Sequence, residues 1–220
     1  MAKKAKQSPK PLKKIIILMV EGDTEVEFYN LVLKTIYKNV TSRNGDSYFD
    51  RFYVEKPINI KGIGRFQQDA VAQFDNKKPK YDKRFNDYKL EYHVFLCIDT
   101  DVFNFYQNPP LNKDKLKQNL YTSGADNVSY IEANKSIEDW FLCDLSGIKD
   151  YLNLKKLSPG YKKQEKGAEK LNSIFSQANR TYIKGCKADG FVNKLDIQKI
   201  MCTYKKELGS LLEVFEPGQS

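Results

Sequence analysis

Residues 15–25 read Ile-Ile-Ile-Leu-Met-Val-Glu-Gly-Asp-Thr-Glu, an apolar run that ends abruptly at a carboxylate. The six apolar residues are mostly β-branched, which predicts a short strand buried on both faces, as in a parallel sheet. Gly22 ends the strand. Residues 26–36 then carry apolar side chains at spacings of three and four, which predicts a helix capped by Asp23 or Thr24.

Two acids lie at the carboxyl end of this predicted strand. Glu21 follows its last apolar residue, and Glu25 lies in the first helical turn, from which it can point back toward the same crevice. Ligands of open α/β sheets bind outside the carboxyl ends of the strands, so this is a candidate site. A structural interpretation stays open, in which Glu25 completes a capping box and Glu21 is a solvated strand-end residue.

Residues 92–101 repeat the pattern with the sequence Tyr-His-Val-Phe-Leu-Cys-Ile-Asp-Thr-Asp. A nearly continuous apolar strand ends at Asp99, and a second acid, Asp101, follows two residues later. Carboxylates that converge at neighbouring strand ends repel one another in a partly buried site. A hard divalent cation such as Mg²⁺ or Mn²⁺ relieves this repulsion, because it binds carboxylate oxygens together with water and substrate phosphates. The two acid pairs therefore predict a metal site for phosphate chemistry.

These two motifs resemble the Toprim domain of topoisomerases, bacterial primases and overcoming-lysogenization-defect (OLD) nucleases, in which one strand ends in Glu-Gly-x-Thr-Glu and another in Asp-x-Asp. Residues 136–138, Ser-Ile-Glu, are similar to the Ser-x-Glu element of OLD-type nucleases. The longer segment 132–142 is similar to the Glu-x-Trp-Leu stretch of small bacterial Toprim proteins, including RloB-like ones. The resemblance covers roughly residues 14–145 and implies the fold more strongly than any one reaction.

The acid pairs and the resemblance together give a set of expected metal ligands: Glu21, Glu25, Asp99, Asp101 and Glu138. Glu132 is an alternative to Glu138 as the metal ligand from this segment. Glu138 also has a structural interpretation, in which its charge near the first turn of a helix interacts favourably with the helix dipole. Residues 182–184, Tyr-Ile-Lys, are similar to a Tyr-x-Lys segment of some small Toprim-like proteins. This implies that Lys184 reaches the cleft and stabilises charge on a phosphoryl group in the transition state. An ordinary surface lysine is the alternative.

The alternation of strand and helix patterns predicts an α/β fold, a Toprim-like (Rossmann-like), mainly parallel sheet with helices on both faces. Residues 39–50 are expected to form a polar loop, and residues 51–60 a strand near an edge, because Pro57 cannot donate to a ladder. Residues 113–122 predict a helix, and residues 127–131 predict a further strand.

Three parts are expected along the chain. Residues 1–13 are a basic arm, interpreted first as a flexible tail and second as a phosphate-binding arm. Residues 14–145 form the Toprim-like catalytic domain. Residues 146–220 form a mostly helical extension packed on the same domain, with helices at 164–178 and 196–212.

Three further segments carry alternatives. Residues 61–65, Lys-Gly-Ile-Gly-Arg, precede a predicted helix and are interpreted as an ordinary turn rather than a phosphate site. Residues 76–89 mix basic and aromatic side chains, which suits a single-stranded nucleic-acid surface, but a solvated helix or linker is favoured. Residues 102–112 form a loop beside the expected metals. Its aromatic side chains could line the cleft: Phe103, Phe105 and Tyr106.

Composition points to nucleic acid as the partner. The 220-residue chain has a formal net charge of +9 and a pI of about 9.1, and such a charge favours phosphate binding, although solubility alone could explain it. No apolar run approaches the ~20 residues of a membrane span, and no signal-peptide pattern is present. The four cysteines lack CxxC spacing and there is one histidine, so a reduced, cytoplasmic protein without a zinc site is expected.

The predicted function is a metal-dependent nuclease of Toprim type that hydrolyses phosphodiester bonds of DNA or RNA, with one or two Mg²⁺ or Mn²⁺ ions. The resemblance also implies a role in bacterial anti-phage defence. The resemblance further implies that a separate ATPase can be a partner, since the chain itself has no GxxxxGK[ST] sequence. A non-catalytic nucleic-acid-binding or regulatory subunit and a primase-like nucleotidyl transferase are the alternatives. Whether the chain forms a homodimer stays open.

Overall fold

The computed structural model of the chain describes residues 9–104, 111–186 and 190–217. Within these residues, five parallel strands form one sheet with the order β2-β1-β4-β5, and β3 also pairs with β1. The strands are β1 (Leu12–Val20), β2 (Phe52–Val54), β3 (Ile58–Asn59), β4 (Lys89–Asp99) and β5 (Asn127–Ala133). The predicted α/β class and parallel sheet are confirmed.

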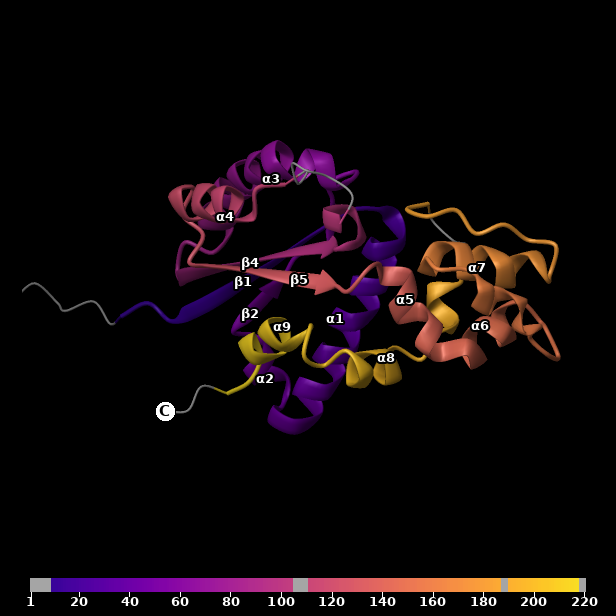
Figure 1. Cartoon of the computed structure of the whole chain (residues 1–220). Helices are drawn as coiled ribbons and strands as arrows, with labels where there is room; N and C mark the ends of the chain where they lie inside the picture. Colours follow the sequence, from indigo (N-terminus) through magenta and orange to yellow (C-terminus); the bar gives the residue numbers. More distant parts are fainter. Residues whose placement is uncertain (1–8, 105–110, 187–189, 218–220) are drawn as a thin grey trace, which may run out of the picture.

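Helices cover both faces of the sheet (Figure 1). Helices α3 (Ile63–Arg84) and α4 (Lys113–Thr122) lie on one face, and α1 (Asp23–Asn44) lies on the other. Strand β1 is buried on both sides because its side chains alternate between two hydrophobic clusters. Ile15, Ile17 and Met19 point to the α3 face, whereas Ile16, Leu18 and Val20 point to the α1 face.

The C-terminal part of the chain packs on the α1 face. Its short helices are α6 (Leu145–Tyr151), α7 (Gly167–Ser176), α8 (Ile197–Thr203) and α9 (Gly209–Val214). Tyr182 and Phe191 belong to the same hydrophobic cluster as Phe28 and Trp140, so this part and the sheet share one core. Figure 1 places α6 and α7 beyond the carboxyl ends of the strands, next to α5 (Ile137–Phe141).

Some local expectations are wrong. Helix α1 is capped by Gly22, and neither Asp23 nor Thr24 makes a capping hydrogen bond. Residues 39–44 continue α1, and α2 (Asp46–Phe49) follows after Gly45, so most of the expected loop is helical. The single helix expected at 196–212 is divided into α8 and α9. At the break, the ring of Tyr204 stacks on Trp140 with centroids 4.6 Å apart, a tertiary contact that the local pattern does not contain.

None of the helices in the described part of the chain is long and apolar enough to cross a membrane.

Candidate metal centre

Parallel pairing of β1 with β4 brings the first two acids together. Leu96 of β4 lies opposite Met19 of β1, so both strands end at the same edge of the sheet. The Glu21 carboxylate accepts a hydrogen bond from the backbone N–H of Asp99, at 2.8 Å. The sequence pattern of two strands ending in acids therefore becomes one site in space.

Two helix beginnings add further carboxylates. Glu25, in the first turn of α1, is only 6% exposed. Asp99 Oδ1 accepts a hydrogen bond from the backbone N–H of Ile137, the first residue of α5, at 2.8 Å. Glu138 follows it and is 1% exposed, and its Oε1 accepts a hydrogen bond from the Tyr182 hydroxyl at 2.9 Å. We call Glu21, Glu25, Asp99, Asp101 and Glu138 the acid cluster.

Residues 182–186, here named the strap, carry a lysine into this cluster. The Lys184 ammonium lies 2.8 Å from Asp99 Oδ2 and 3.5 Å from Asp101 Oδ2. Two hydrogen bonds hold the strap over the start of α1: the Thr24 hydroxyl donates to Cys186 O at 2.6 Å, and the Asp23 N–H donates to Gly185 O at 3.1 Å. Thr24 thus anchors the strap instead of capping the helix.

The strap approaches the backbone closely enough to require glycine. A Cβ atom on Gly22 would lie 2.9 Å from Glu25 Oε2 and 3.0 Å from Gly185 Cα. Gly185 itself has φ of +76°, a left-handed conformation that glycine adopts without strain. The sequence suggested only that Gly22 ends a strand, and nothing local signalled this contact.

Burial and the charges of neighbouring acids raise the pKa of three carboxyl groups in the cluster: Glu21, Glu25 and Asp99. Burial, followed by the charge of Asp99, raises the pKa of Glu25 to about 8 and that of Glu21 to about 7. Burial also raises the pKa of Asp99 to about 6, although Lys184 opposes the rise. Burial alone would lower the pKa of Lys184, but the charges of Asp99 and its neighbours raise it above the ordinary value, so the ammonium stays charged.

Several carboxylate oxygens in the cluster accept no hydrogen bond from the described residues. Among the described residues, Glu25 Oε2, Asp101 Oδ1 and Glu138 Oε2 are buried and have no hydrogen-bond partner. Buried oxygens without partners are costly, and a hard cation is the ligand that satisfies them. The donor set therefore fits Mg²⁺ or Mn²⁺. In the same described residues, however, no three acids already surround one point that an ion could occupy.

Other candidates lie elsewhere. Glu132 is paired with Ile98 in the β4–β5 register, a residue of the α3-face cluster, and its carboxylate contacts the Lys113 ammonium at 2.8 Å. It therefore lies on the opposite face from Asp99. Lys113 also lies over the ring of Phe103, at 4.6 Å. Phe105 and Tyr106 are outside the described residues.

Comparison of the chain with protein-family models, curated proteins and solved structures gave no match.

Proposed function

We propose that the acid cluster is the centre of a divalent-cation-dependent hydrolase that cleaves phosphodiester bonds in nucleic acid. One observation supports this more than any other: near the carboxyl edge of a parallel sheet, Glu25, Asp101 and Glu138 each have a buried oxygen without a hydrogen-bond partner among the described residues. Residues that only stabilise a fold usually have such oxygens satisfied. The formal charge of +9 supports a polyanionic substrate.

The carboxylates of the acid cluster are the expected metal ligands in this proposal. Glu21, Glu25, Asp101 and Glu138 would hold the cation, together with Asp99. A bound Mg²⁺ or Mn²⁺ would activate water and stabilise the leaving oxygen. The backbone N–H of Ile137 fixes the direction of Asp99, and the Tyr182 hydroxyl fixes Glu138.

Lys184 has a separate role in this proposal. Its ammonium is charged, half-exposed and held between Asp99 and Asp101, so it can contact a phosphate that approaches the cluster. A fixed positive charge at that position stabilises the additional negative charge of a phosphoryl group in the transition state.

A second candidate function follows from the same lysine. Because the Lys184 ammonium already neutralises part of the acid charge, the cluster has a structural explanation without any metal. A nucleic-acid-binding subunit without catalytic activity would then be the function. Wild type and cluster variants of such a subunit would retain nucleic acid equally and cleave none.

The experiment separates these two functions. Labelled single- and double-stranded DNA and RNA are incubated with the protein in Mg²⁺, Mn²⁺ or EDTA, with Glu21→Gln and Asp99→Asn beside wild type. Glu132→Gln is the matched control, because Glu132 lies near the same sheet edge but on the other face, paired with Lys113. Hydrolysis that needs metal, is lost in both cluster variants and persists in Glu132→Gln supports the nuclease. Retention of nucleic acid without cleavage in every metal contradicts it.

A further inference from the structure

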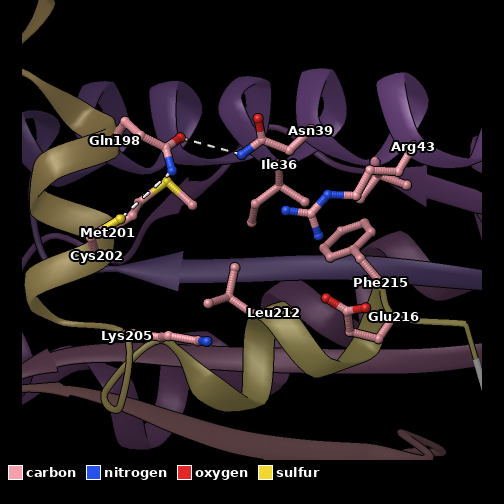
Figure 2. Close-up of a pocket in the computed structure, with 11 residues that line it drawn as sticks. Ile36, Asn39, Arg43, Gln198, Met201, Cys202, Lys205, Leu212, Phe215 and Glu216 are labelled. Carbon is pink, nitrogen blue, oxygen red and sulfur yellow. Dashed lines mark hydrogen bonds between the residues drawn. The ribbon is translucent and has the colours of Figure 1, made fainter.

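A concave surface lies between the C-terminal half of α1 and helices α8 and α9 (Figure 2). Its volume is about 260 Å³, and we call it the α1–α9 groove. Ile36, its first lining residue on α1, follows Asp23 by 13 positions, which is about 20 Å along a helix. The groove is therefore separate from the acid cluster.

The floor of the groove is apolar. The side chains that form it are Ile36, Val40, Met201, Leu212 and Phe215. Met201 and Phe215 belong to the core and are almost fully buried, at 5% and 2% exposure, so the core fixes their positions and only a small part of each side chain faces the groove. Figure 2 shows Leu212 and Phe215 lying between α1 and α9. An apolar floor of this kind binds a ring or a short alkyl chain.

The rim of the groove is charged, with a surplus of one positive charge. Arg43 and Lys205 line it together with a single acid, Glu216. In Figure 2 the Arg43 guanidinium is directed toward Phe215, above the apolar floor. Among the described residues, neither cation has an ion-pair partner. An unpaired guanidinium beside an apolar floor suits a carboxylate or phosphate, which it can bind through two parallel hydrogen bonds.

We propose that the α1–α9 groove binds a small organic anion that has an apolar body and one carboxylate or phosphate group. The volume is just below the range of about 300–1,000 Å³ for drug-sized ligands, so the body is limited to one or two rings or a short chain. A groove of this volume suits a small molecule better than a macromolecule, because a stable macromolecular interface buries about 800 Å² on each partner. This inference does not depend on the proposed nuclease activity.

Methionine methyl signals give a direct test. The chain has three methionines. Of these, Met201 lines the groove, whereas Met19 lies in the core on the α3 face and serves as an internal control. Protein labelled with ¹³C-methyl methionine is titrated with 4-phenylbutyrate, 4-phenylbutanol and 4-phenylbutylamine, which share a body and differ in charge. The proposal expects saturable shifts of Met201 alone, with phenylbutyrate binding at least about 5-fold more tightly than phenylbutylamine.

Two variants locate the anion contact. Arg43→Gln is expected to weaken phenylbutyrate about 5-fold and to leave phenylbutanol unchanged, because only the charged contact is removed. Lys38→Gln is the matched control, since Lys38 is exposed on the same helix but does not line the groove. Leu212→Trp is expected to block both probes by filling the groove.

Four results would overturn the proposal. These are equal affinity for the anion and the amine, no shift of Met201 at about 10 mM probe, equal shifts of Met19 and Met201, and a Met201 signal that moves with protein concentration alone. The last result would mean that a second copy of the chain covers the groove.

Discussion

Acids on the two sides of the sheet have opposite electrostatic environments. On the α3 face, Glu55 accepts a hydrogen bond from the Tyr81 hydroxyl at 2.6 Å and contacts the Lys77 ammonium at 3.1 Å. Asp82 accepts one from the Tyr92 hydroxyl at 2.6 Å and pairs with Lys78 at 2.9 Å. We call these two sets the α3 acid pairs. In the acid cluster, one tyrosine and one lysine serve five carboxylates, and among the described residues Glu25 Oε2, Asp101 Oδ1 and Glu138 Oε2 have no hydrogen-bond partner.

The pKa values follow this difference. Burial raises the pKa of Glu55, but the hydrogen bonds from Tyr81 and Lys77 outweigh it and leave the pKa below its ordinary value. The same balance lowers the pKa of Asp82. In the acid cluster burial prevails, and the pKa values of Glu21, Glu25 and Asp99 rise. Hydrogen bonds and ion pairs thus outweigh burial for Glu55 and Asp82, whereas burial outweighs them for Glu21, Glu25 and Asp99, and perturbed carboxyl groups of this kind are typical of functional sites.

The largest expected difference between the two sets is catalytic. Asp99→Asn is expected to reduce metal-dependent cleavage by about 100-fold or more, because it removes a charged ligand at the centre of the cluster. Asp82→Asn, in the α3 acid pairs, is expected to change the rate less than about 2-fold. Initial rates on one labelled substrate give both numbers. A similar loss of cleavage rate in the two variants would contradict a catalytic role that is specific to the acid cluster.

The next difference is in the pH dependence of stability. The folded-state pKa values of Glu21, Glu25 and Asp99 exceed their ordinary values, so the folded protein binds more protons than the unfolded chain between about pH 4.5 and pH 8. Without metal, the free energy of unfolding should therefore fall by about 3 kcal/mol as the pH rises from 5 to 8. Urea unfolding in EDTA measures it.

Saturating Mg²⁺ is the control for that measurement. It should reduce the fall, because a bound cation favours the ionised carboxylates. A free energy of unfolding that rises steadily from pH 5 to pH 8 in EDTA would show that hydrogen bonds and ion pairs outweigh burial in the acid cluster, as they do in the α3 acid pairs.

Neutral substitutions should have opposite effects in the two sets. Glu25→Gln is expected to raise the free energy of unfolding by about 2 kcal/mol at pH 8 in EDTA, because it removes a buried and repelled charge. Glu55→Gln is expected to lower it by about 1 kcal/mol, because a charge-assisted hydrogen bond is weakened. Thermal or urea unfolding of both variants measures these changes. If both substitutions change the free energy of unfolding in the same direction, the acid cluster and the α3 acid pairs do not differ in this respect.

The smallest effect concerns the backbone next to the cluster. Gly22→Ala is expected to destabilise the protein by about 1 kcal/mol and to displace the strap, because the new Cβ would lie 3.0 Å from Gly185 Cα. Gly64→Ala is the matched control, since a Cβ at Gly64 in α3 meets nothing within 4 Å. It should be neutral or slightly stabilising. Unfolding midpoints compare the two, and a neutral Gly22→Ala would mean that the strap is not closely packed there.

Local patterns in the sequence predicted the strands and the placement of acids at their ends. Apolar runs that stop at Glu21 and Asp99 indicate two strand ends, and parallel pairing then brings these residues together. Glu138 and Lys184 depended on a family resemblance. The contacts that position them, Tyr182 with Glu138 and Lys184 with Asp99, join residues 44 and 85 positions apart, and no periodicity encodes such contacts.

Other features were missed because tertiary contacts override local signals. Thr24 has the residue type of a helix cap, yet its hydroxyl binds Cys186 O. Glu132 has the residue type of a metal ligand, yet the alternation of β5 places it on the face opposite Asp99. The donors of the α3 acid pairs are tyrosines and lysines in α3 and β4, whose contacts appear only when helix and sheet pack together.

Direct measurement of Mn²⁺ binding tests the central claim without knowledge of the substrate. Electron paramagnetic resonance of free Mn²⁺, titrated with protein at pH 7.5, should show one or two bound ions per chain in wild type and in Asp82→Asn. Binding should weaken by about 100-fold in Asp99→Asn. If wild type binds no Mn²⁺ at about 1 mM, or if Asp99→Asn binds it as tightly as wild type, the acid cluster is not a metal centre.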